Sequence, residues 1–257
     1  MVWSCLVSIL PGMAQTEKLT DYVNPFVGTD GYGNVYPGAQ IPFGGIQISP
    51  DTDSRFYDAA SGYKYNHLTL MGFSLTHLSG TGIPDLGDFL FIPGTGEMKL
   101  EPGTHEDPDQ GYRSRYSHDK EWASPNYYAV ELADYGVKAE MTSGVRSGMF
   151  RFTYPESDNA FIMIDMNHTL WQSCEWSNLR MINDSTITGY KLVKGWGPER
   201  HVYFTATFSK KLTGLRFVQD KKPVIYNTSR FRSSYEAWGK NLMACISFDT
   251  KAGEEVT

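Results

Sequence analysis

The sequence has 257 residues, of which 40% are hydrophobic and 20% charged, so it holds enough apolar material for one large domain or two small ones. The formal net charge is −6, and no cluster of Lys and Arg occurs that could neutralise a phosphate backbone, which argues against a nucleic-acid partner. The 16 Tyr, 14 Phe, 6 Trp and 25 Gly favour a β-rich protein.

The N-terminus has the pattern of a processed export signal. Residues 2–10 are mostly apolar, and Gly12 and Ala14 are small residues at the two positions that precede a cleavage site. The positively charged segment that usually comes first is missing here. The apolar run is too short to span a membrane. We therefore expect residues 1–14 to be a partial signal peptide, residues 15–257 to form the folded domain, and no membrane span.

The first part of the mature chain is rich in loops. Residues 21–50 interleave six glycines with Pro25, Pro37 and Pro42, a density that no helix tolerates, and only residues 45–49 alternate as a short strand. Gly31 and Gly33 open no helix, so a dinucleotide-binding motif is rejected. Residues 51–66 are predicted to form a second, polar and aromatic loop.

The central stretch is residues 67–93, where two apolar, β-favouring segments flank the turn LSGTGIPDLGD, residues 78–88. Glycine lets a backbone approach a ligand closely or adopt positive φ, and short hydroxyls and carboxylates hydrogen-bond polyols. Two interpretations stay open at this point. The turn is either an ordinary hairpin loop or a loop that reaches a sugar.

Three side chains around this turn are candidates for a role in binding. Asp85 and Asp88 lie three residues apart, where either could accept a hydrogen bond from a sugar hydroxyl. For Asp88 we expect instead that the carboxylate accepts hydrogen bonds from the loop backbone. His77, just before the turn, is expected to be a hydrogen-bonded structural histidine rather than a base.

The rest of the chain is predicted to be a β-sandwich. The acids of residues 101–125 do not match the spacing of a calcium loop, so this segment is predicted to be solvated. Residues 126–154 hold three alternating runs typical of an antiparallel meander, and turn signals separate most of the later runs. The later predicted strands cover residues 160–165, 186–193, 201–208, 214–218 and 242–248. The one helix expected spans Arg232–Asn241, and without an internal linker a single domain is predicted.

The residues alone show no complete catalytic or metal site. The six histidines are scattered, no H-E-x-x-H or G-x-S-x-G occurs, and Cys174 and Cys245 fit no zinc pattern. Cys245 lies in a strand-like run and is expected to be buried, while a disulfide to Cys174 is allowed. Three tryptophans can serve either as sugar platforms or as packing residues in the core or an interface: Trp171, Trp176 and Trp196.

Several blocks of sequence occur in the order found in a known family. The chain resembles the N-terminal domain of glycoside hydrolase family 92, the exported calcium-dependent exo-α-mannosidases common in gut Bacteroidetes, over about residues 21–250. The blocks that carry the resemblance are NPFVGTDGYGNVYPGAQIPFGGIQISPDT, SGYKYN, GFSLTHLSGTGIPDLGDFLFIP, YSHDKEWASPNYYAVELADYGVKAEMTSGVRSGMFRFTYP and GWGPERHVYFTATFSK.

This resemblance implies an all-β, antiparallel β-sandwich of the supersandwich, galactose-mutarotase-like kind with few short helices. It implies that a C-terminal (α/α)6 barrel follows, carries the catalytic carboxylates and the Ca2+ ligands, and is absent from this chain, which stops at Thr257. The whole enzyme would hydrolyse terminal α-mannosides of mannose-containing glycans with inversion, in the periplasm or on the outer surface of a Gram-negative bacterium. We expect this chain alone to be inactive, because the catalytic carboxylates have no carrier in it.

In the family, the sandwich domain completes the pocket for the terminal mannose. The positions that match this role are Phe26, Gly28, Gly80, Thr81, Gly82, Ile83 and Asp85. The loop Arg55–Tyr57 matches a region that contacts the next sugar. Ile83 and Leu86 depart from the family, in which Cys and Tyr are common at these positions. The alternative is a standalone carbohydrate-binding or periplasmic interaction module without catalysis.

Overall fold

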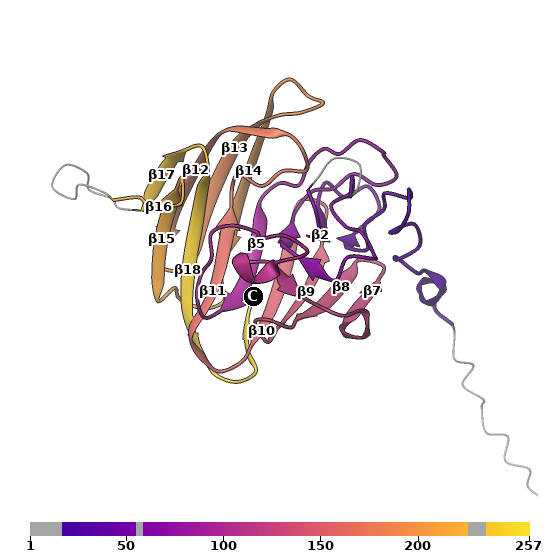
Figure 1. The fold of residues 1–257 in the computed structure, drawn as a ribbon, viewed down its shortest axis with the longest axis horizontal. Coiled ribbons are helices and arrows are strands. Elements are labelled where there is room, and N and C mark those ends of the chain that lie inside the picture. Colours follow the sequence, from indigo (N-terminus) through magenta and orange to yellow (C-terminus); the bar gives the residue numbers. More distant parts are fainter. Residues whose placement is uncertain (1–16, 55–58, 226–234) are drawn as a thin grey trace, which may run out of the picture.

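The computed structural model describes residues 17–54, 59–225 and 235–257, and these residues form antiparallel strands almost throughout (Figure 1). Three short 3-10 helices are the only helices among them: η1 (Leu19–Tyr22), η2 (Pro108–Gln110) and η3 (His118–Lys120). The predicted all-β, antiparallel class is confirmed. The predicted signal peptide, residues 1–14, and the loop Arg55–Tyr57 lie outside the described residues.

Four sheets are present in the described part of the chain. The largest has eight strands in the order β1 (Ala39–Gln40), β2 (Gln47–Asp51), β4 (Gly72–Ser74), β5 (Leu90–Thr95), β11 (Ser157–Asp165), β18 (Leu242–Thr250), β15 (Gly214–Gln219) and β16 (Lys222–Pro223). A five-stranded sheet runs β19 (Glu254–Val256), β10 (Gly148–Tyr154), β9 (Val137–Ser143), β8 (Tyr127–Leu132) and β7 (Glu121–Ser124). A four-stranded sheet runs β14 (Arg200–Thr207), β13 (Thr186–Lys194), β12 (Ser173–Asn183) and β17 (Glu236–Gly239). The smallest pairs β3 (Thr69–Leu70) with β6 (Ser114–Arg115).

The eight-stranded sheet is one layer of a sandwich, and the five- and four-stranded sheets lie side by side against it (Figure 1). One hydrophobic cluster fills the space between the layers, with Phe91 and Ile246 from the long sheet, Tyr128 from the five-stranded sheet and Leu179 from the four-stranded sheet. This is the supersandwich arrangement that the sequence resemblance implies.

The central strands of the long sheet are buried on both faces. In β11, Ile162 and Ile164 belong to the main core, whereas Phe161 and Met163 point to a second cluster on the opposite face, which the segment around Tyr112 covers. Both faces of such a strand must be apolar, so its sequence reads as a continuous hydrophobic run rather than as an alternation. The most deeply buried strands are therefore the easiest to find in the sequence.

Most predicted strands are found, and one predicted element is wrong. The meander over residues 126–154 forms as β8, β9 and β10. The predicted helix Arg232–Asn241 is not formed where the structure describes it, because Glu236–Gly239 is strand β17 and pairs with β12. Residues 232–234 lie outside the described residues. The open edge of β12 and the burial of Ala237 outweigh the helical preference of this segment.

Cys174 and Cys245 are both buried and both free, so the disulfide that the sequence allows is not formed. The predicted burial of Cys245 is confirmed. In the described ranges, no helix has the length and apolar character that crossing a membrane requires.

Candidate functional site

The turn LSGTGIPDLGD, here called the 78–88 loop, connects β4 to β5, and its base is a hairpin. The amide of Leu75 donates to the carbonyl of Asp88 over 2.9 Å, and the amide of Gly87 donates to the carbonyl of Thr76 over 2.8 Å. The hairpin interpretation is therefore right for the base of the loop. The tip of the loop, residues 79–85, extends beyond these two backbone hydrogen bonds.

A buried ion-pair cluster supports the base from inside the sandwich. Asp88 and Lys191 are fully buried, and the Lys191 Nζ lies 3.1 Å from the Asp88 Oδ1. Arg200 Nη1 and the Thr76 hydroxyl both donate to the Asp88 Oδ2. Burial alone would raise the pKa of Asp88, but the charges of Lys191 and Arg200 outweigh it and lower this pKa. Asp88 is thus a carboxylate, and its predicted role as acceptor for the loop backbone is wrong, because two cations from β13 and β14 reach it.

A second buried cluster lies around Asp51 at the end of β2. His77 Nδ1 lies 2.7 Å from the Gln47 carbonyl oxygen, and its Nε2 lies 2.7 Å from the Asp51 Oδ1. His168 Nε2 lies 2.7 Å from the Asp51 Oδ2. Burial tends to raise the pKa of Asp51, but the charges and hydrogen bonds of His77 and His168 lower it on balance. The prediction that His77 is a hydrogen-bonded structural residue is confirmed.

The two clusters are joined, because Lys191 Nζ also donates to the backbone carbonyl of His168 over 2.7 Å. The 78–88 loop therefore rests on a continuous network of buried charges that connects β2, β13, β14 and the segment before β12. Buried networks of this kind hold backbone segments in one arrangement, since breaking a single member leaves the others unpaired. We conclude that the base of the loop is held rigidly.

Asp85 ties the tip to a neighbouring segment. It is 6% exposed, its Oδ1 accepts from the amide of Leu86 over 2.6 Å, and its Oδ2 accepts from the amide of Trp196 over 2.9 Å. Gln172 Nε2 donates to the carbonyl of Pro84 over 3.1 Å. Both oxygens of the Asp85 carboxylate are occupied by backbone donors, so the structure shows it as an anchor of the loop. A direct contact from Asp85 to a sugar stays a prediction.

The tip itself is the exposed part of the loop. Gly80, Gly82 and Ile83 are exposed, and Thr81 is half-buried with its hydroxyl donating to the Ile83 carbonyl over 3.1 Å. Gly80 has φ +75°, a conformation that favours glycine. Gly82 has no such φ, and a Cβ placed on it would meet nothing within 4 Å. Neither the backbone nor the packing of the described residues explains why position 82 is glycine.

Of Phe26 and Gly28, the two predicted site residues nearest the N-terminus, hydrogen bonds among the described residues connect only Gly28 to the region of the 78–88 loop. The amide of Gly80 donates to the carbonyl of Asn34 over 2.7 Å, and the amide of Val35 donates to the carbonyl of Gly28 over 3.3 Å. Phe26 lies edge-on to Tyr65, with ring centroids 5.8 Å apart. Gly28 therefore shares one surface region with the 78–88 loop, while Phe26 is placed by Tyr65 rather than by the loop.

The three tryptophans singled out in the sequence lie at the surface, so core packing does not account for them. Trp171, Trp176 and Trp196 are 55%, 46% and 56% exposed. Trp176 belongs to an exposed face of the four-stranded sheet, here called the aromatic face, whose other members are Tyr190, Tyr203 and Trp238. In this face Trp238 is opposite Asn178, Asn178 is opposite Tyr190, and Tyr190 is opposite Tyr203, so one row of side chains crosses all four strands.

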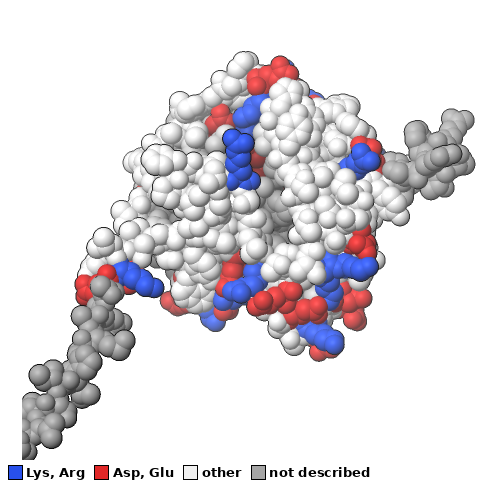
Figure 2. All heavy atoms as spheres, turned by 180° about the vertical axis from the view of Figure 1, so that it is seen from behind, with Lys and Arg blue, Asp and Glu red and all other residues white. Residues whose placement is uncertain are grey.

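One hollow lies away from the predicted site residues, and one face of the molecule carries exposed charges of both signs. A hollow of about 710 Å³ is lined by polar residues that include Asp165, Asn167, Gln172 and Asp220, and none of the seven predicted site residues lines it. Figure 2 shows a face of the molecule on which charged side chains of both signs gather mainly along the lower margin, with smaller groups at the top and right edges and most of the area between them uncharged. That face therefore presents no broad field of a single sign.

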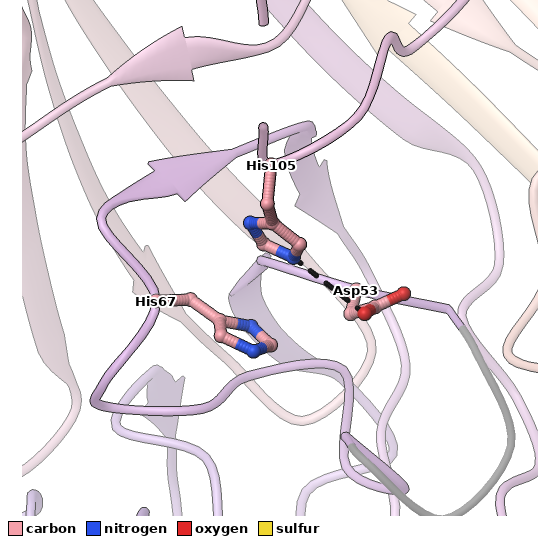
Figure 3. Close-up of side chains that lie close together, drawn as sticks. All are labelled: Asp53, His67 and His105. Atoms are coloured by element: carbon pink, nitrogen blue, oxygen red, sulfur yellow. Dashed lines mark ion pairs between the residues drawn. The ribbon is translucent and has the colours of Figure 1, made fainter. Parts of the chain in front are cut away.

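Sequence reasoning missed one group of side chains. Asp53, His67 and His105 lie far apart in the sequence but offer ligand atoms that all lie within 4.8 Å of one another (Figure 3). The prediction that this chain holds no metal site rested on local spacing, which carries no signal for three residues that only the fold brings together. Calcium prefers six to eight oxygen ligands, and this group offers two imidazoles and one carboxylate, so it does not suit the calcium that the resemblance implies.

The fold and the loop define this chain as an antiparallel β-sandwich with a rigidly based, glycine-containing surface loop. The chain belongs to glycosyl hydrolase family 92, since the model of that family's N-terminal domain matches residues 22–257. A secreted glycosidase from Arthroderma benhamiae, itself uncharacterized, is 30% identical over 139 residues, which are 53% of this chain and 17% of the fungal protein.

Two solved structures share the fold. The family GH92 glycosyl hydrolase ccman5 superposes with a TM-score of 0.74 and 26% identity over 92% of this chain. An inverting mannosidase of family GH92 from Bacteroides thetaiotaomicron superposes with a TM-score of 0.74 and 24% identity over 94% of this chain. In each case the match covers 31% of the solved chain, so this chain spans about a third of the length of these relatives.

Proposed function

We propose that this chain is the N-terminal, pocket-completing domain of an exported exo-acting α-mannosidase, which removes terminal α-mannose from glycans with inversion of configuration. Membership of family 92 supports glycoside hydrolysis. The inverting mannosidase named above belongs to the same family, which is why we choose mannosides and inversion. The secreted fungal relative supports export, and we place the enzyme in the periplasm or on the outer surface of a Gram-negative bacterium.

The observation that carries this proposal is the unexplained glycine at the tip of the 78–88 loop. Gly82 is exposed, it needs no unusual φ, and open space surrounds the position that its Cβ would occupy. The base of the same loop is held by fully buried charges. A rigid base under a tip that contains two exposed glycines suits a surface that a sugar ring approaches closely, as in one wall of a pocket.

The catalytic groups are expected in the rest of the protein. An inverting glycosidase needs one carboxylic acid to protonate the leaving group and one carboxylate to activate water, about 6.5–9.5 Å apart. The two acids of the loop do not fit these roles, because Asp88 is buried between Lys191 and Arg200 and Asp85 accepts from two backbone amides. We therefore expect this chain alone to be inactive.

We propose that the calcium ion implied by the resemblance also binds outside this chain. Because the metal-ligand group of the described residues does not suit calcium, we assign no catalytic step to calcium in this chain. The partner of this domain would then be the (α/α)6 barrel that the resemblance implies, with the glycan bound where the two meet.

The proposal is tested with the full-length protein that carries this domain. Incubated with α-mannobiosides, it should release mannose whose first-formed anomer is β, as followed by proton NMR, while residues 15–257 alone release none. In the full-length protein, Gly82→Ala should lower kcat/KM by about 10-fold or more, because a methyl group is placed where the sugar approaches. Gly214→Ala is the matched control, since position 214 also lacks positive φ and its Cβ would make only ordinary contacts. Equal kinetics for the two variants would remove the loop tip from the pocket.

The aromatic face favours a second candidate function, a glycan-binding module. Trp238 and Tyr203 are 54% and 70% exposed, and the rings of Tyr190 and Tyr203 lie 4.9 Å apart. Exposed rings in a row can stack on the apolar faces of successive sugars. Asn178 lies between them, with its Nδ2 donating to Glu236 and to the Ala237 carbonyl, so its Oδ1 is the atom that could accept a hydrogen bond from a sugar.

Binding of this chain alone to mannan and to mannose oligosaccharides, measured by calorimetry, distinguishes the two functions. A binding module retains affinity without any further domain and loses it in Trp238→Ala. The pocket-completing domain shows no measurable affinity by itself, and Trp238→Ala leaves hydrolysis by the full-length enzyme unchanged.

A further inference from the structure

We propose that Asp53, His67 and His105 form a binding site for a divalent transition-metal ion of the Zn2+ type. The three residues come from separate segments: Asp53 follows β2, His67 precedes β3, and His105 lies in the stretch before η2. Their side chains converge in Figure 3. Nothing in the proposed glycosidase function requires this site.

The geometry is close to that of a zinc centre. His105 Nε2 lies 3.5 Å from the Asp53 Oδ2, and all three ligand atoms lie within 4.8 Å of one another. A tetrahedral zinc ion with bonds of about 2.0–2.2 Å holds its ligand atoms roughly 3.3–3.6 Å apart. The His105–Asp53 separation already fits, and modest side-chain rotations close the remaining distances. Two imidazoles and one carboxylate are three zinc ligands, which leaves the fourth position for water.

Both histidines are oriented as metal ligands usually are. His67 Nδ1 lies 3.0 Å from the Thr52 hydroxyl, and His105 Nδ1 lies 2.9 Å from the Thr69 hydroxyl. Bonding at Nδ1 fixes the ring and leaves Nε2 as the nitrogen for a metal. The Thr52 hydroxyl also accepts from the amide of Lys64, and it can donate in turn to the carbonyl of Gly62, so it can accept from His67.

One atom of the cluster lacks the partner that its burial demands. His105 Nε2 is buried and makes no hydrogen bond within the described structure, although a carboxylate oxygen is 3.5 Å away. Buried polar atoms are nearly always hydrogen-bonded, and a bound cation would satisfy this nitrogen. The ring of His67, 4.1 Å from that of His105, faces the same centre.

The three side chains supply two imidazoles and one carboxylate, and Arg113 lies beside them, where its Nη1 contacts the Thr69 hydroxyl. Arg113 is held in place by the carbonyl of Thr52, to which its Nη1 donates over 2.5 Å. The carboxylate of Asp53 is thus the one anionic ligand, a set suited to Zn2+ and unsuited to Ca2+.

Calorimetric titration of the purified protein with Zn2+, after treatment with a chelator, tests the proposal. We expect one Zn2+ per chain at this site, a raised Tm, and no such effect from Ca2+. His67→Ala and His105→Ala should each weaken Zn2+ binding by about 100-fold or more, and Thr69→Val by about 10- to 100-fold through loss of the group that orients His105. His201→Ala is the control, because His201 is exposed and pairs with Glu199.

A second measurement on the unaltered protein keeps the test decisive if a variant fails to fold. Zn2+ should shift the imidazole nitrogen resonances of His67 and His105, and Co2+ should give the visible absorption of a four-coordinate ion. Zn2+ binding that persists in both histidine variants, or that shifts only His201, would overturn the proposal. So would the absence of any binding by the unaltered protein.

Discussion

Asp51 and Asp53 lie two residues apart, at and just after the end of β2, and each lies near two histidines in a different arrangement. Around Asp51, the Nε2 atoms of His77 and His168 each lie 2.7 Å from a carboxylate oxygen, and the other nitrogen of His77 donates to a carbonyl. Around Asp53, the nearest imidazole nitrogen is 3.5 Å away and has no hydrogen bond. The first cluster is closed and serves the 78–88 loop, whereas the second has the geometry of a site that a ligand completes.

The largest effect is expected from opening the closed cluster. His77→Ala should lower the free energy of unfolding by about 3–5 kcal/mol, because it leaves a buried carboxylate without one of its two partners. His105→Ala should lower it by only about 0.5–1.5 kcal/mol in chelator, since one hydrogen bond to a hydroxyl is lost. Urea unfolding of both variants measures the difference. Equal losses would mean that the two clusters contribute alike to stability.

A smaller effect is expected at the anchor of the loop tip. Asp85→Ala removes an acceptor from the amides of Leu86 and Trp196, and hydrogen bonds to a charged group contribute about 1.5–3 kcal/mol. We expect a stability loss of this size, together with a lower kcat/KM in the full-length enzyme. If activity falls while urea unfolding stays as in the unaltered protein, Asp85 contacts the sugar directly and is not an anchor.

The pH dependence of the free energy of unfolding should reveal carboxylates whose pKa is lowered in the folded protein, such as Glu140. Hydrogen bonds from Arg151 lower the pKa of Glu140 from 4.5 to about 2. A lowered pKa in the folded state stabilises the protein above the unfolded pKa, and this contribution is lost as the pH falls from about 4.5 to about 2. As the pH falls from about 4.5 to about 2, the free energy of unfolding of Glu140→Gln should therefore decrease less than that of the unaltered protein. Urea unfolding at several pH values measures this difference. Parallel curves for the two proteins would contradict the assignment.

The smallest effect on stability is expected on the aromatic face. Trp238 is half exposed on β17, so Trp238→Ala should change the free energy of unfolding by about 1 kcal/mol or less. A larger loss would show that the face is packed in solution, against a second chain or another domain. Sedimentation of the variant beside the unaltered protein tells these two cases apart.

Much of the fold can be predicted from the sequence, and the failures have physical causes. The strands β11 and β18 are apolar on both faces, so their runs are unmistakable. Strand β12 was not predicted, because two register shifts, one between Cys174 and Trp176, break its alternation. The segment Glu236–Gly239 reads as helical locally but pairs with the edge of β12, a long-range preference that no local pattern contains.

The candidate site could be predicted only in part. The 78–88 loop is recognisable from its glycines, hydroxyls and acids, and His77 as a structural residue follows from its place beside a strand. That Lys191 and Arg200 pair with Asp88 is not among the expectations from the sequence. Lys191 lies on the inward face of β13, and a lysine at an inward position of an alternating run indicates a buried charge with a partner. The grouping of Asp53, His67 and His105 leaves no trace in local spacing, because three separate segments supply them.

The claim that the 78–88 loop is one wall of a sugar pocket is tested most directly at Thr81, whose hydroxyl lies at the tip and bonds only within the loop in the described structure. If the hydroxyl binds the sugar, Thr81→Ala should lower kcat/KM for an α-mannobioside in the full-length enzyme by roughly 5- to 150-fold, which corresponds to about 1–3 kcal/mol of lost transition-state stabilisation. Urea unfolding should change by less than about 1 kcal/mol. Unchanged kinetics in a protein of unchanged stability would contradict the account.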